Sequence, residues 1–123
     1  MKIDLKGRKV LIAGGSRGIG FSIAEAFAKA GADVAICARS QAALDQAGAS
    51  LKQHGGKVLA SACDLGDADA IKRWVGEAQD VLGGIDCLVN NASGFGRTDD
   101  EAGWAASIQI DLMATVQIGR AHV

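Results

Sequence analysis

The chain has 123 residues, of which 49% are hydrophobic and 22% charged, with a formal net charge of −1. These values are typical of one globular domain. Acidic and basic residues are interspersed, which excludes the basic footprint of a nucleic-acid-binding protein and the polybasic helix of a membrane-surface protein. No apolar stretch approaches the ~18 residues of a membrane span, and charges occupy the amino terminus where a signal peptide needs an apolar core. We therefore expect a cytoplasmic protein without nucleic-acid or membrane partners.

The three cysteines, Cys37, Cys63 and Cys87, are far apart in the sequence and form no C-x-x-C pair. Each lies in or beside a segment that we predict to be a strand. We interpret them as buried, reduced packing residues, and we expect no metal site.

The first predicted elements are a strand at 10–13 and a helix at 18–30. The strand is a short apolar run, which is typical of a strand buried on both faces. In the helix Ile19, Ile23 and Phe27 recur every four residues, so we expect them to line one apolar face. The segment between the two elements is rich in glycine.

The rest of the chain continues to alternate strands with helices. We predict strands at 33–38, 58–62 and 85–90, a helix capped by Ser40, a helix opened by Asp67 and closed by Gly83 and Gly84, and a last helix from 99 or 100 onward. Such alternation implies right-handed crossovers and an α/β fold with a doubly wound parallel sheet. We expect the strand order 3-2-1-4, with a ligand site beyond the carboxyl ends of strands 1 and 4.

Gly14, Gly18 and Gly20 fall in the first strand-to-helix turn, with the spacing G-x-x-x-G-x-G. The first amides of a helix have no partner within it, so they favour an anion, and glycines let the backbone approach a phosphate closely. No Lys follows the last glycine, which argues against an ATPase or GTPase. Asn90 and Asn91, at the end of the fourth strand, are expected to face this turn across the sheet. The alternative is a glycine turn with a structural role only.

Two motifs resemble those of the short-chain dehydrogenase/reductase family. Residues 13–20, A-G-G-S-R-G-I-G, resemble the family's T-G-x-x-x-G-[IL]-G, and residues 90–93, N-N-A-S, resemble its N-N-A-G. Ala13 and Ser93 depart from the usual Thr and Gly. The similarity extends from about residue 5 to 116 and looks closest to bacterial 3-oxoacyl reductase-like members.

The resemblance implies a Rossmann domain that binds a nicotinamide cofactor, a small carbonyl or alcohol substrate, and a homo-oligomer for the full-length protein. Asp64 and Leu65 match the family's acidic position beside the adenine ring. The cofactor-binding residues that it implies are Gly14, Ser16, Arg17, Gly18, Ile19, Gly20, Arg39, Ser40, Asp64, Leu65, Asn91 and Ala92.

Arg39 stands where dinucleotide-binding folds contact the adenosine ribose, with Ser40 next to it and no acid nearby. An acid at this place accepts from the 2′-hydroxyl of NAD, whereas an Arg pairs with the 2′-phosphate of NADP. Arg17 can reach the same phosphate, so that two planar guanidinium groups would donate to it. We therefore favour NADP(H) over NAD(H). The alternative is that both arginines are solvated surface residues.

The catalytic residues that the resemblance implies are an Asn, a Ser and a Tyr-x-x-x-Lys. The sequence contains no Tyr and ends before a fifth strand. Aligning residues 104–112 with the family's W-x-x-x-[IV]-x-V-N-L places Asp111 at the Asn. We expect the chain to carry only the cofactor-binding half of a hydride-transferring oxidoreductase. A stand-alone nucleotide-binding or regulatory module is the alternative, and a methyltransferase is disfavoured because Arg39 replaces the acid such enzymes usually need.

We expect residues 1–123 to be one domain, incomplete at its carboxyl end and truncated after the fourth strand. The last helix is still periodic at Ile108, Leu112 and Thr115 when it approaches the end. Residues 118–123 break this pattern and resemble the translation of a widely used sequencing adapter. We therefore expect native sequence to end near Val116.

Overall fold

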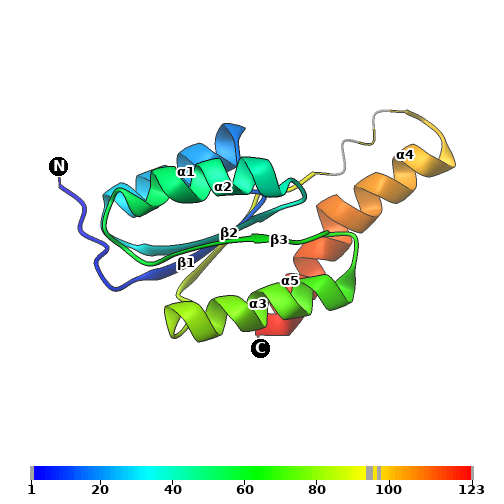
Figure 1. The fold of residues 1–123 in the computed structure, drawn as a ribbon. Helices are drawn as coiled ribbons and strands as arrows, with labels where there is room; N and C mark the ends of the chain where they lie inside the picture. Colours follow the sequence, from blue (N-terminus) through cyan, green and yellow to red (C-terminus); the bar gives the residue numbers. More distant parts are fainter. Residues whose placement is uncertain (1, 94–95, 97, 123) are drawn as a thin grey trace.

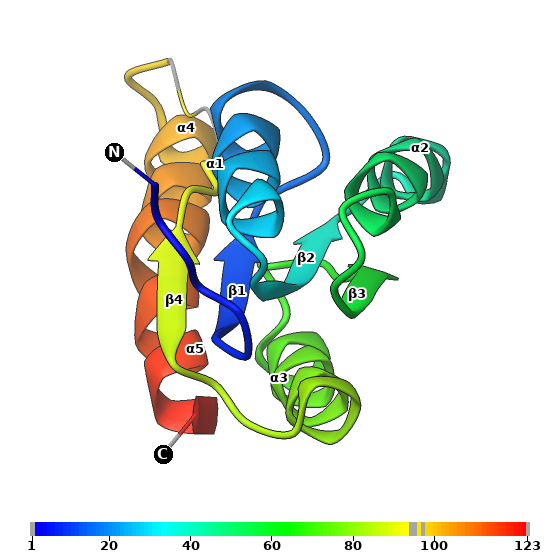
Figure 2. The ribbon, with the colours of Figure 1, turned by 90° about the vertical axis from the view of Figure 1, so that its left-hand side faces the viewer.

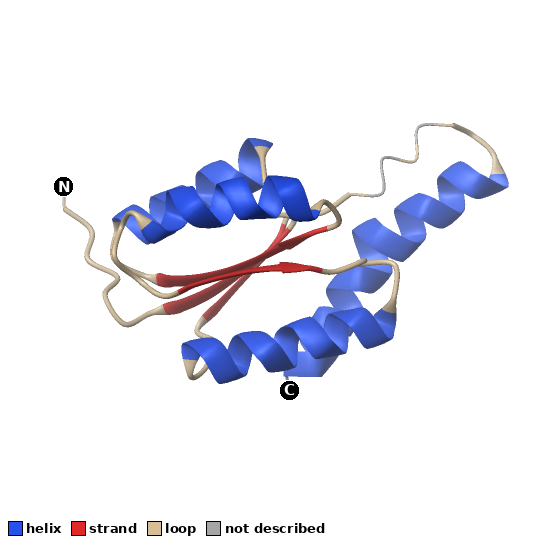
Figure 3. Ribbon diagram, viewed as in Figure 1, coloured by secondary structure: helices blue, strands red, loops and turns tan. Residues whose placement is uncertain are grey.

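A single parallel sheet forms the centre of the protein in a computed structural model that describes residues 2–93, 96 and 98–122. Its strands are β1 (Lys9–Ala13), β2 (Asp33–Ala38), β3 (Val58–Ala62) and β4 (Cys87–Asn90). They form one layer between the helices (Figure 3) and lie in the order β3-β2-β1-β4, which confirms the predicted sheet. β4 begins two residues later than the expected 85. The order places β1 and β4 side by side although they are distant in sequence.

Helices cover both faces of the sheet. α1 (Gly18–Lys29) and α2 (Gln41–Lys52) lie on one face, and α3 (Ala68–Leu82) and α5 (Ala114–His122) on the other (Figures 1 and 2). α4 (Glu101–Ala106) and a π-helical segment, η1 (Ser107–Met113), lead into α5. Among the described helices none has the length and apolar character needed to cross a bilayer.

Two apolar cores lie on opposite faces because successive strand residues point to opposite sides. Val10 and Ile12 of β1 pack in the core under α1 and α2, whereas Leu11 packs with Trp74 in the core under α3 and α5. All four side chains are at most 2% exposed. The expected burial of the first strand on both faces is therefore confirmed.

The predicted apolar face of α1 is wrong at its first position, since Ile19 is 74% exposed. Ile23 and Phe27 are only partly buried. The buried positions of the helix are instead the small residues Gly20, Ala24 and Ala28. Small side chains let the helix axis approach the sheet closely, which leaves Ile19 at the open carboxyl edge of the sheet.

The apolar period of the last helix does not mark its buried side. Ile108, Leu112 and Thr115 are exposed, whereas Ala114 and Ile118 are buried. Residues 107–113 form η1, in which each hydrogen bond joins residues five apart instead of four, so an α-helical period does not describe this segment. Ile118, in the segment that we expected to be non-native, is 1% exposed and packs in the core that contains α3.

The helix starts follow the predicted capping residues. Ser40 Oγ accepts a hydrogen bond of 3.3 Å from the Ala43 amide at the start of α2. Asp67 Oδ1 accepts from the Asp69 amide at 2.9 Å and from the Ala70 amide at 3.4 Å at the start of α3. α3 ends at Gly83, whose φ of +83° is the left-handed conformation that glycine adopts without strain.

We expect Asp67→Ala to lower the free energy of unfolding by about 1 kcal/mol, because two first-turn amides of α3 lose their acceptor. Asp67→Asn keeps an acceptor oxygen in the same place and should retain most of the stability. Urea denaturation followed by circular dichroism measures both. Equal losses in the two variants would contradict a capping role.

Candidate functional site

The glycine turn after β1 is fixed to the neighbouring strand by backbone hydrogen bonds. The amides of Gly14 and Gly15 both donate to the Cys37 carbonyl of β2, each at 3.1 Å. Gly14 has a φ of +86°, a left-handed conformation that reverses the chain direction at the end of β1. The turn thus lies at the carboxyl ends of β1 and β2, and α1 begins directly after it.

Close backbone contact makes two of the glycines necessary. A Cβ on Gly14 would lie 3.1 Å from the Cα of Ala92, and one on Gly20 would overlap the Gly14 carbonyl and lie 2.6 Å from Asn91 Nδ2. A Cβ at Gly14 would therefore push the segment after β4 away from the turn, and one at Gly20 would push the first turn of α1 away from it. The expected proximity of the glycine turn to the segment after β4 is confirmed.

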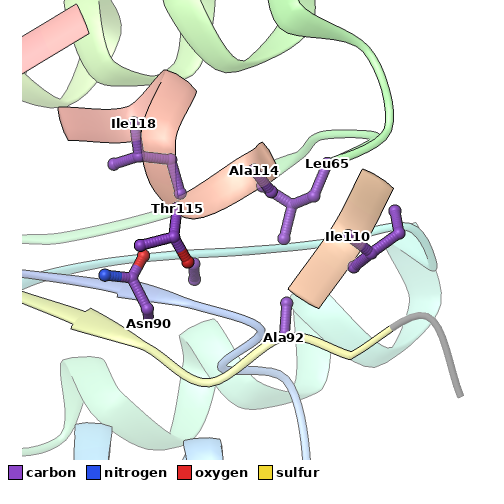
Figure 4. Close-up of a pocket in the computed structure, with 8 residues that line it drawn as sticks. Leu65, Asn90, Ala92, Ile110, Ala114, Thr115 and Ile118 are labelled. Atoms are coloured by element: carbon purple, nitrogen blue, oxygen red, sulfur yellow. The ribbon is translucent and has the colours of Figure 1, made fainter. Parts of the chain in front are cut away.

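Asn91 joins β4 to the glycine turn. Its amide donates to the Ala13 carbonyl and its Nδ2 donates to the Gly14 carbonyl, both at 3.1 Å. Asn90, which we expected to face the same turn, instead lines a cavity of about 10 Å³ on the other face of the sheet. There its side chain lies next to Thr115 (Figure 4). The difference follows from the alternation of side chains along a strand.

The amino terminus of α1 offers backbone donors to a ligand. The helix follows Arg17, whose φ of −161° is extended, and no side chain among the described residues caps it. Its first amides have no acceptor within the helix, and the helix dipole adds positive potential there. Arg17, Gly18 and Ile19 are exposed at this end. Together with the close glycine contacts, this arrangement suits a phosphate group.

A second, open hollow of about 410 Å³ lies at the carboxyl ends of β2 and β3. Its lining residues are Arg39, Ala62, Cys63, Asp64, Asp67, Ala70 and Arg73. Arg39 forms no ion pair with any described residue. The carboxylates are engaged by backbone amides, since Asp64 Oδ1 accepts from Gly66 at 2.9 Å and Asp67 caps α3. Neither Arg39 nor Arg73 forms an ion pair with a residue that the structure describes.

The predicted site residues fall into three groups. Those of the glycine turn and the segment after β4 lie together around the start of α1. Arg39 and Asp64 line the second hollow, and Ser40 follows Arg39 as the cap of α2. The Leu65 side chain is 6% exposed and packs in the core instead. Asp111 is exposed on η1 and lines neither cavity.

Sequence reasoning missed Arg73 and Cys63 as members of the second hollow. Asp67, Ala70 and Arg73 are spaced by three, which places them along one side of α3. That spacing was an available signal for Arg73. No comparable signal existed for Cys63, since its position depends on how β3 pairs with β2.

Cys37 and Cys63 belong to the same core cluster, and Cys63 lines this hollow. Interaction with the Cys63 side chain raises the pKa of Cys37, and burial raises it further. Interaction with the Cys37 side chain lowers the pKa of Cys63, and the positive charge of Arg73 lowers it as well. No group of three side chains among the described residues could hold a metal ion.

Comparison with known proteins shows the family. The family model for short chain dehydrogenases matches residues 8–123, so the chain belongs to the short-chain dehydrogenase/reductase family. It is 43% identical over 88 residues to the ketoacyl reductase HetN of Nostoc sp., covering 72% of this chain and 31% of that protein. It is 36% identical to dehydrogenase/reductase SDR family member 4 of Homo sapiens, covering 97% of this chain and 45% of that protein. The chain thus spans less than half the length of these relatives.

Solved structures show the same fold. L-sorbose reductase from Gluconobacter frateurii, complexed with NADPH and L-sorbose, superimposes with a TM-score of 0.91 at 35% identity, covering 99% of this chain and 48% of that one. A short chain dehydrogenase from Burkholderia cenocepacia in complex with NADP gives a TM-score of 0.89 at 34% identity, covering 96% and 50%. The expected Rossmann-type α/β fold is confirmed.

We expect Gly20→Ala to destabilise the protein by about 1 to 3 kcal/mol, because the new Cβ overlaps the Gly14 carbonyl and crowds Asn91. Gly76→Ala is the matched control. Gly76 lies inside α3 with open space at its Cβ position, so alanine there should stabilise by up to about 1 kcal/mol. Urea denaturation of both variants measures the difference. Similar effects of the two substitutions would contradict the close contact at Gly20.

Proposed function

We propose that this chain binds NADP(H) and forms the cofactor-binding half of an oxidoreductase that transfers hydride between NADP(H) and a carbonyl or alcohol. The observation that carries the proposal is the uncapped start of α1 against a turn where Gly14 and Gly20 leave no room for a Cβ. Backbone amides and the helix dipole there fit the diphosphate of a dinucleotide. When bound, the cofactor supplies or accepts the hydride.

The residues around the turn fit this ligand. Ser16, Arg17, Gly18 and Ile19 would lie along the diphosphate, while Asn91 and Ala92 hold the turn from the side of β4. These assignments, and the place of Asp64 and Leu65 beside the adenine, are proposals. Membership of the family supports them.

Arg39 supports the preference for NADP(H). It is exposed, unpaired with any described residue and located at the end of β2, where an acid would favour NAD. Arg17 is also exposed and unpaired in the described part of the chain, so we propose that both arginines contact the 2′-phosphate. The complexes of L-sorbose reductase with NADPH and of the Burkholderia dehydrogenase with NADP support the same choice.

We further propose that Asp111 occupies the position of the family's catalytic Asn, where its backbone carbonyl would help to hold a proton-relay water. A homo-oligomer of the full-length protein is also proposed. Trp104, Ile108, Leu112 and Val116 support it, because they recur every four residues and are 36% to 62% exposed. Such a stripe is typical of a surface that packs against another apolar surface.

We expect Arg39→Asp to weaken the binding of adenosine 2′,5′-bisphosphate at least about tenfold, because a charged hydrogen bond is worth ~1.5 to 3 kcal/mol. Binding of adenosine 5′-monophosphate, which lacks the 2′-phosphate, should change much less. Isothermal titration calorimetry measures both. Arg8→Asp makes the same charge change on the exposed loop before β1 and serves as the control. An unchanged ratio of the two affinities in Arg39→Asp would contradict the NADP(H) assignment.

The alternative, a stand-alone nucleotide-binding module, predicts the same nucleotide binding. The two hypotheses differ in whether the chain supports catalysis when it is joined to a catalytic half. We expect the purified 123-residue chain to catalyse no oxidation of NADPH by a ketone, because it contains no Tyr to act as the acid. A fusion to the carboxyl-terminal half of a related short-chain dehydrogenase should gain this activity if the chain is a cofactor-binding half. Turnover by the unfused chain would contradict the proposal.

A further inference from the structure

Cys37 and Cys63 lie on the same face of the sheet. Cys37 pairs with Ser61 in the ladder between β2 and β3. Cys63 follows two residues after Ser61, and its amide donates to the Ala38 carbonyl at 3.0 Å, which continues the ladder. Because side chains alternate along a strand, Cys63 points to the same side as Cys37. Both residues belong to the core under α3, where Cys37 is 0% and Cys63 5% exposed.

The Cys37 and Cys63 sulfurs differ in how accessible they are to a small reagent from solvent. Cys63 lines the open hollow of about 410 Å³, whereas Cys37 lines neither this hollow nor the cavity of about 10 Å³. A small reagent in the hollow therefore meets Cys63 first. Interaction with the Cys37 side chain and the charge of Arg73 lower the pKa of Cys63, although burial and the nearby Asp64 and Asp67 oppose this shift. Thiolate character decides which cysteine reacts.

The backbone at Cys63 can also adjust. β3 is the edge strand of the sheet, and its last paired residue is Ala62. Cys63 begins the connection to α3, so a small shift there breaks no contact with a further strand. Disulfide formation needs Cβ atoms about 3.8 Å apart, which is closer than diagonal neighbours usually lie in a sheet. The backbone at Cys63 must therefore shift towards Cys37. Because β3 is an edge strand, no further strand opposes this shift.

We propose that Cys63 and Cys37 form an oxidisable thiol pair, in which hydrogen peroxide oxidises Cys63 and Cys37 then closes a disulfide. The Cys63 thiolate attacks one peroxide oxygen, which gives a sulfenic acid and hydroxide. The Cys37 sulfur then attacks the Cys63 sulfur, the S–O bond breaks, and the departing hydroxyl group and the Cys37 proton leave as water. The two thiols lose two electrons and two protons, and peroxide is reduced to two waters.

Cys87 provides an internal comparison. It lies in β4, is partly buried, and packs in the core under α1 and α2, on the opposite face from Cys37 and Cys63. It therefore cannot meet either of them without disruption of the sheet. A disulfide in the intact monomer should exclude Cys87.

The test treats the 123-residue chain with a small excess of hydrogen peroxide, blocks free thiols by alkylation, and maps peptides without reduction. Before alkylation we expect the intact mass to fall by two hydrogens. After alkylation we expect one Cys37–Cys63 linked peptide and an alkylated Cys87, and dithiothreitol should restore the linked thiols. Cys87→Ser should form the same linked peptide. In Cys37→Ser the sulfenic acid at Cys63 should persist and be trapped by dimedone.

The mapping of the unsubstituted chain decides the proposal even if a variant fails to fold. A control peptide that contains cysteine shows that the peroxide treatment is effective. If the protein keeps three free thiols under the conditions that oxidise this peptide, the proposal is overturned. A disulfide that includes Cys87, or overoxidation of Cys63 beside an unreacted Cys37, would also overturn it. None of these outcomes depends on whether the protein binds NADP(H).

Discussion

The close approach of the glycine turn to the strand ends is the constraint on which the site depends. Gly14 and Gly20 allow the backbone of α1 to lie against the end of β1, and a Cβ at Gly20 would overlap the Gly14 carbonyl. That carbonyl then accepts a hydrogen bond from Asn91, which brings the end of β4 to the same point. If either contact were lost, the uncapped amides of α1 would no longer be held at the switch point of the sheet.

Much of the fold could be predicted because its signals are local. Ser40, Asp67 and Gly83 mark helix ends through bonds to residues a few positions away. Alternation of strands and helices then leaves few topologies open, and the order 3-2-1-4 follows from handedness and the doubly wound pattern. The buried faces of α1 and α5 could not be predicted in this way. They depend on how closely a helix packs and on the π-helical segment, which no residue pattern marked.

In the candidate site, too, the residues in local motifs could be predicted, whereas those placed by packing could not. The glycine turn and Asn91 could be predicted because short motifs carry them and the strand order brings them together. Arg73 and Cys63 enter the second hollow through the start of α3 and through the register of β3 on β2. Register between strands distant in sequence is set by packing of whole faces, so the sequence alone did not predict the contact between Cys37 and Cys63.

Cys37 connects the two parts of the site. Its carbonyl accepts the amides of Gly14 and Gly15, and its thiol contacts Cys63 at the second hollow. The proposed phosphate end of the site is built from backbone groups, with no room for a Cβ at Gly20, whereas the second hollow is lined by side chains such as Arg39. Ligand preference can therefore change at the second hollow while the glycine turn stays fixed. A disulfide between Cys63 and Cys37 would act at the second hollow and would include the residue whose carbonyl holds the turn.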